Sequence, residues 1–118
     1  MPSKYRRLVV WQRAMQLVLA VYDASRAFPA EEKFGLQSQI RRAAVSVPSN
    51  IAEGDGRGGK QDQRRFLLTA RGSLMEVETQ ILIAEALGYV SAEQSASLLD
   101  SIERTARPLN GLIAQLGT

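Results

Sequence analysis

Apolar residues recur at alternating intervals of three and four in four separate stretches, and this spacing restricts the fold more than any other feature of the sequence. Such intervals place side chains on one face of an α-helix. The recurring positions are Val10, Ala14, Leu17, Val21, Ser25 and Phe28; then Leu36, Ile40, Ala43, Val47 and Ile51; then Phe66, Ala70, Ser73, Val77, Ile81, Ala84 and Gly88; then Leu98, Ile102, Leu109, Ile113 and Leu116. No stretch alternates with the two-residue period of a strand over a useful length. The sequence therefore predicts an all-α protein.

Helix-breaking residues separate the four stretches. The first is expected to end at Phe28-Pro29, because a residue before proline is pushed out of the helical region. The second is expected to run from about Glu31 to the glycine-rich segment 54–59, and Ser91 with Gln94 forms a capping-box pattern at the start of the fourth. Two short links and one glycine-rich link predict an antiparallel up-down-up-down four-helix bundle, a single domain over residues 1–118.

Two residue types that carry much of enzyme chemistry are missing, since the 118 residues include no histidine and no cysteine. This excludes disulfides, thiolate and imidazole metal sites, and acid–base catalysis by histidine. A carboxylate di-metal bundle needs Glu-x-x-His pairs. The segment 54–60 is not a Walker loop, because Gln61 follows Lys60 and the segment joins two predicted helices. We therefore expect a protein that is not an enzyme and that binds no metal or cofactor.

Targeting segments are not evident in the sequence. The apolar stretch near the N-terminus is broken at Gln12 and Arg13, which makes it too short for a signal peptide. No window approaches the roughly 18 uninterrupted apolar residues of a membrane span. The expected location is the cytoplasm, without a membrane partner.

Charge is distributed unevenly along the chain, although the net charge is only +3. Residues 1–30 carry five cations and one carboxylate, whereas residues 61–118 carry five cations and seven carboxylates. Such an asymmetry is typical of a nucleic-acid footprint or of charge-complementary subunits, and it also fits an unevenly solvated surface. The candidate phosphate contacts are Arg6, Arg7, Arg13, Arg41, Arg42, Arg57, Lys60, Arg64 and Arg65.

The first predicted helix has a second apolar face. Trp11, Met15, Val18 and Tyr22 follow a 4-3-4 spacing beside the first stripe. A surface helix needs one apolar face for its own bundle, so a second one predicts contact with another subunit. The alternative is that Trp11 and Tyr22 simply widen the core.

Polar residues interrupt the second and third stretches. One hypothesis pairs Arg42 with Glu53 or Glu76 in a buried network that specifies helix register; the other makes Arg41 and Arg42 a phosphate-contacting pair. Glycine within a helix costs about 1 kcal/mol relative to alanine. We therefore expect Gly72-Ser73 to mark a close helix–helix contact. Gly88 is expected to form a left-handed helix cap.

A specific set of residues resembles one protein family. The set comprises Val10–Met15, Phe34-Gly35-Leu36, Gln39–Ala44, Ser46-Val47-Pro48, Asn50–Gly54, Phe66-Leu67, Ala70, Gly72-Ser73, Glu76 and Leu87-Gly88-Tyr89. It resembles the small four-helix proteins encoded in intervening sequences of bacterial 23S ribosomal RNA genes. That family includes the accessory variability determinant of diversity-generating retroelements, a basic pentamer that binds nucleic acid and a reverse transcriptase.

The resemblance implies a homopentamer, basic residues on the assembled surface and, by analogy, a reverse transcriptase as a partner. Together with the charge pattern, it predicts a homo-oligomer, a pentamer by family resemblance, that binds RNA or DNA. The alternative is a protein-interaction scaffold without nucleic-acid binding. Strong salt dependence of binding would distinguish the first from the second.

Overall fold

The computed structural model describes residues 4–117, which form four α-helices and two short 3-10 turns. The helices are α1 (Val9–Ser25), α2 (Leu36–Asp55), α3 (Lys60–Ala86) and α4 (Ala92–Gln115); the turns are η1 (Lys4–Arg7) and η2 (Ala30–Glu32). No strand occurs in this range. The all-α prediction is confirmed.

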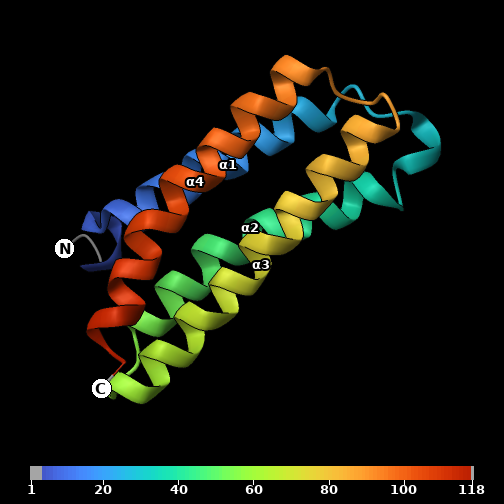
Figure 1. Cartoon of the computed structure of the whole chain (residues 1–118). Coiled ribbons are helices and arrows are strands. Elements are labelled where there is room, and N and C mark those ends of the chain that lie inside the picture. Colours follow the sequence, from blue (N-terminus) through green and yellow to red (C-terminus); the bar gives the residue numbers. More distant parts are fainter. Residues whose placement is uncertain (1–3, 118) are drawn as a thin grey trace.

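The helices form an antiparallel bundle with up-down-up-down connections (Figure 1). Helix α1 contacts α2 and α4, and α3 contacts the same two, so α1 and α3 lie at diagonal corners. The bundle measures 43 × 23 × 22 Å. The turn η1, the C-terminal end of α4 and the α2–α3 link lie at one end of it, and η2 and the α3–α4 link lie at the other (Figure 1). Within residues 4–117, no helix is long and apolar enough to cross a membrane.

Most of the apolar positions found in the sequence form the core, although Gly88 is exposed and Leu116 is half-buried. All six positions of the first stretch and all five of the second are buried, and in the third the buried side chains include Leu67, Ala70, Val77, Ile81 and Ala84. Phe66 departs from the expectation, since it is only half-buried and Leu67 takes the core position. Pro48 and Pro108 both lie within continuous helices.

Two helix boundaries differ from the prediction. Helix α1 ends at Ser25, three residues before Phe28, although Phe28 is still buried in the core. Helix α2 begins at Leu36 rather than near Glu31, because η2 intervenes and the Glu32 carboxylate accepts a hydrogen bond from the Leu36 N–H at 3.0 Å. A side chain outside the helix thus supplies the cap for the first turn of α2.

The α3–α4 link matches its prediction closely. Gly88 has a φ of +79°, and the N–H groups of Gly88 and Tyr89 donate to the carbonyls of Glu85 and Ala84, a Schellman arrangement. The Ser91 hydroxyl then accepts from the Gln94 N–H at 3.0 Å, and the Gln94 side chain accepts from the Ser91 N–H at 2.9 Å. The predicted cap and capping box are both confirmed.

The close helix–helix contact expected at Gly72-Ser73 is found at Ser73, which is buried with its hydroxyl 2.8 Å from that of Ser46 on α2, but not at Gly72. Gly72 is exposed, and a Cβ placed there would meet no described atom within 4 Å. A close approach at a glycine occurs instead at Gly54 near the end of α2, where a Cβ would lie 3.0 Å from the Phe66 Cβ and 3.2 Å from the Gln63 carbonyl oxygen. Gly54 therefore allows α2 and α3 to converge just before the link.

Candidate nucleic-acid interface

One end of the bundle gathers cations from two distant parts of the sequence. The turn η1 packs on α1 and α2, at the end where the α2–α3 link also lies (Figure 1). We call this region the basic end and define it by Lys4, Arg6, Arg7, Arg57, Lys60, Arg64 and Arg65. All of these side chains are exposed except Arg64, which is half-buried. Arg13 lies in the second turn of α1, near the same end.

Carboxylates at the basic end pair with two of its arginines. Glu53 accepts from Arg57 at 2.7 Å, and Asp62 accepts from Arg65 at 3.3 Å. The four side chains are 45–66% exposed, so the two pairs add little to stability and leave the guanidinium groups accessible.

An aromatic side chain lies between two of these arginines. The guanidinium carbon of Arg57 is 5.0 Å from the centre of the Phe66 ring, and that of Arg65 is 4.8 Å from it. Both distances fall within the range of cation–π attraction. Phe66 therefore contacts two guanidinium groups, one from the link and one from α3. The sequence shows the Arg65-Phe66 neighbours, but it does not show that Arg57 folds back over the same ring.

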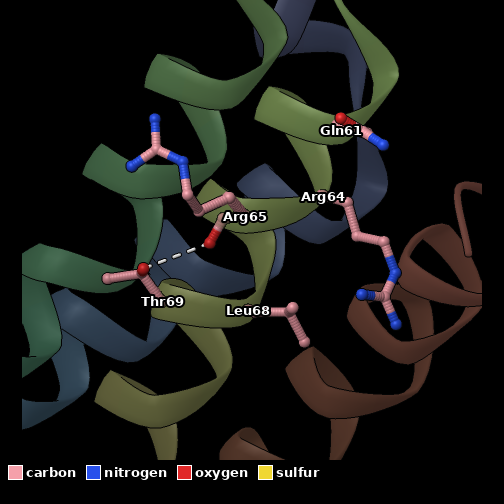
Figure 2. A pocket seen from close by; sticks show the side chains of 5 residues that line it. All are labelled: Gln61, Arg64, Arg65, Leu68 and Thr69. Atoms are coloured by element: carbon pink, nitrogen blue, oxygen red, sulfur yellow. Dashed lines mark hydrogen bonds between the residues drawn. The ribbon is translucent and has the colours of Figure 1, made fainter.

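Adjacent arginines of α3 point to opposite sides of the helix (Figure 2). Arg65 is directed toward α2, whereas Arg64 reaches toward the last turn of α4, where a Cβ on Gly117 would lie 3.5 Å from Arg64 Nε. Between them lies a hollow of about 410 Å³ lined also by Gln61, Leu68 and Thr69. Arg64 Nε is buried without a hydrogen-bond partner among residues 4–117.

Arg41 has a different environment from the basic end. Its Nε donates to the Ser25 hydroxyl at 2.8 Å, its Nη2 donates to the Tyr22 carbonyl at 3.2 Å, and its guanidinium lies 4.6 Å from the Tyr22 ring centre. Arg41 thus binds the carbonyl end of α1, where the helix dipole favours a positive charge. Fourteen residues of helix, about 21 Å, separate it from the end of α2.

Arg42 lines a polar groove between α2 and α3. The groove of about 350 Å³ is also lined by Gln39, Ala43, Ser46, Ser73 and Glu76, and the Ser46 and Ser73 hydroxyls lie 2.8 Å apart. Arg42 and Glu76 are both exposed and form no ion pair, and Glu53 pairs with Arg57 instead. The buried arginine–glutamate network expected from the sequence is therefore wrong for the described residues.

The second apolar face of α1 forms one wall of a groove. Helix α1 contributes Trp11, Met15 and Val18 to its lining, and α2 contributes Val45, Pro48, Ser49 and Ala52. Tyr5 of η1 also lines the groove and packs edge-on against Trp11, with ring centres 5.4 Å apart. We call this the α1–α2 groove; its volume is about 320 Å³. Tyr22 lies one turn farther along α1, under Arg41. Trp11 and Val18 also pack against the core, so this face is shared between core and surface.

These features define a four-helix bundle with a cationic end and an apolar groove; residues 4–117 contain no cluster of acidic residues able to hold a metal ion. The chain belongs to the family of 23S rRNA-intervening sequence proteins, which it matches over residues 6–111.

A solved structure supports the fold. The chain is similar to a protein of unknown function from the S23 ribosomal protein family of Bacteroides thetaiotaomicron, with a TM-score of 0.77 and 20% identity. The similarity covers 93% of this chain and 100% of that one. A search of the curated proteins found no match. At this level of identity, the structural neighbour shows the fold alone.

Proposed function

We propose that this protein is a non-enzymatic homo-oligomer that binds RNA or DNA through phosphate contacts at the basic end. The observation that carries the proposal is the placing of Arg57 of the α2–α3 link and Arg65 of α3 beside the Phe66 ring, at the same end of the bundle as the cations of η1. Phosphate contacts require accessible lysine and arginine side chains, which this surface provides. Exposed guanidinium planes beside an aromatic ring also offer a surface on which an unpaired base can stack.

Assembly concentrates this charge. One chain carries a net charge of only +3, but several copies with their basic ends on one side would present a much larger field. Five copies is the number that the family resemblance implies, and a reverse transcriptase partner is likewise an expectation of that resemblance.

The experiment is a salt titration of binding to single-stranded RNA and to duplex DNA. Each phosphate contact contributes roughly 0.7 to the slope of log K against log salt for single strands and roughly 0.9 for duplex DNA. The double variant Arg57→Gln/Arg65→Gln should flatten the slope by about 1.4 on RNA, the sum of two contacts. The matched control is Arg104→Gln/Arg107→Gln on α4, which removes the same charge from another face. Equal loss from both variants would show a general charge effect and would contradict a site at the basic end.

A second candidate function, a protein-interaction scaffold, is favoured by the α1–α2 groove. If the protein assembles but ignores RNA and DNA at low salt, the scaffold becomes the better description. Binding to a protein partner should then survive high salt and depend on Trp11 or Tyr22.

A further inference from the structure

Helix α3 carries an apolar stripe on its outward side, away from the core. Met75, Leu82 and Ile83 are 63%, 47% and 43% exposed, and Gly72, Thr79 and Ala86 complete the stripe at intervals of three and four. The Thr79 hydroxyl donates to the Met75 carbonyl at 3.0 Å, so its hydrogen-bonding capacity is used within the helix. We call this set the α3 stripe.

Among residues 4–117, no other helix of the bundle covers the stripe. The core side of α3 is occupied by Ala70, Leu74, Val77, Ile81 and Ala84, which are all buried. Leaving large apolar side chains in water forgoes about 25 cal/mol for each Å² that could be buried. A contiguous patch of this kind marks an interaction surface.

The α3 stripe and the α1–α2 groove differ in shape and lie on different sides of the molecule. The stripe is a ridge on one helix, whereas the groove lies between two helices. Because α1 and α3 occupy diagonal corners of the bundle, no chain can fill its own groove with its own stripe. A helix ridge packs naturally into a groove between two helices.

The charges around the α1–α2 groove and the α3 stripe are complementary. Arg41 lies one helical turn beyond Val45 at one end of the groove, and Arg6 and Arg7 flank Tyr5 at the other. Beside the stripe lie the exposed carboxylates Glu76, Glu78 and Glu85, whereas Arg71 is turned toward α4, where it donates to Asn110. A contact between two α3 stripes would bring these carboxylates together, and a contact between two α1–α2 grooves would bring the arginines together. Both arrangements are unfavourable because like charges repel.

We infer that two copies of this chain join head to tail, with the α3 stripe of one copy seated in the α1–α2 groove of the next. The contact is heterologous, because each copy contributes a different surface. An open chain of copies then keeps one free stripe at one end and one free groove at the other until the assembly closes into a ring. The inference rests on the assembly part of the proposed function and is independent of nucleic-acid binding.

A mixing experiment tests this arrangement directly. Met75→Asp damages the stripe and leaves the groove intact; Val45→Asp damages the groove and leaves the stripe intact. Each variant alone should be a monomer by light scattering, whereas an equimolar mixture should form a dimer of twice the chain mass, joined by the one intact stripe and the one intact groove. The matched control is Phe34→Asp, since Phe34 is 90% exposed and lies on neither surface. It should assemble like the unmodified protein.

Each alternative result has a distinct meaning. The unmodified protein could assemble while the mixture remains monomeric, with both variants shown to be folded by circular dichroism. That result would overturn the head-to-tail contact but not the proposed assembly. If Met75→Asp assembles normally, the stripe is overturned. If the unmodified protein is itself a monomer, both the inference and the proposed assembly fail. The salt slope for RNA, measured on the monomeric variants, tests nucleic-acid binding separately.

Discussion

The Tyr89 hydroxyl donates a 2.8 Å hydrogen bond to Glu32 Oε2, while Glu32 Oε1 accepts from the Leu36 N–H. One carboxylate thus joins η2 to the α3–α4 link and caps α2. The Leu36 N–H and, to a lesser extent, the Tyr89 hydroxyl lower the pKa of Glu32 from its ordinary value. The same bond raises the pKa of Tyr89, with smaller contributions from burial and from the charges of Glu32 and Glu31.

Stability should depend on this pair at both ends of the pH range. Because the pKa of Glu32 is lowered by folding, its contribution is present above the ordinary glutamate pKa of about 4.3 and is lost as pH falls through the lower folded value. Because the pKa of Tyr89 is raised by folding, its contribution is present below about pH 10 and is lost as pH rises through the folded value. Urea denaturation of Glu32→Gln should show lower stability than the native chain at pH 7, and the difference should shrink in acid. The control Asp100→Asn, which changes an exposed carboxylate on α4, should leave the stability at pH 7 unchanged.

Arg41 should stabilise the folded protein. Removing its guanidinium leaves the Ser25 hydroxyl, 1% exposed, with one partner fewer at the end of α1. Arg41→Met keeps the apolar stem, and we expect a loss of about 1–2 kcal/mol in the free energy of unfolding. Arg42→Met removes the same charge from the neighbouring exposed position and should change the stability by less than about 0.5 kcal/mol. Equal losses in the two variants would show that the contacts of Arg41 with α1 contribute nothing specific.

Two glycine-to-alanine substitutions should have opposite effects. Gly72→Ala adds a methyl group to open space on a helix and should stabilise the protein by about 1 kcal/mol. Gly54→Ala places a methyl group 3.0 Å from the Phe66 Cβ, which must move with the α3 backbone. The resulting overpacking, about 1–3 kcal/mol, should outweigh the gain in helix propensity. Thermal unfolding at matched protein concentration measures both, and a rise in Tm for Gly54→Ala would show that α2 and α3 separate easily.

The Ser46 and Ser73 hydroxyls should be energetically coupled. They lie 2.8 Å apart, and Asn50 Nδ2 also donates to Ser46 Oγ at 2.9 Å. Each single alanine variant should lose about 1 kcal/mol, because the remaining hydroxyl is left with one partner fewer. The double variant should lose less than the sum of the two, which a double-mutant cycle detects. Additive losses would mean that the two hydroxyls do not interact, and Ser97→Ala on the exposed side of α4 serves as the control.

The features predicted correctly are those encoded locally. The buried seam follows from the spacing of apolar residues, and the capping box and the Gly88 cap each depend on residues within one or two turns. The start of α2 could not be predicted in this way, because Glu32 is held by Tyr89, 57 positions away. The prediction for Gly72 was wrong. Gly72 comes directly before the core position Ser73, and this position on the helix already points away from the core.

The candidate site was predicted in composition but not in geometry. The sequence identifies the cations of the basic end, yet it does not show that η1 and the α2–α3 link lie at the same end of the bundle or that Arg57 returns to Phe66. Arg41 was chosen for its charge, and only the folded chain shows its contacts with Ser25 and Tyr22. The α3 stripe was not predicted, because its residues follow the same three- and four-residue spacing as the core positions of α3 and only the core positions were identified.

The order of the helices has a consequence for how the bundle forms and opens. The α1–α2, α2–α3 and α3–α4 pairs are neighbours in sequence, but α1 and α4 come from opposite ends of the chain. Closing that last seam requires the longest loop and therefore the largest loss of chain entropy. The other three pairs form as successive helical hairpins, so the α1–α4 seam should close last during folding. Amide protons along it should exchange with solvent by partial openings that leave α2 and α3 paired.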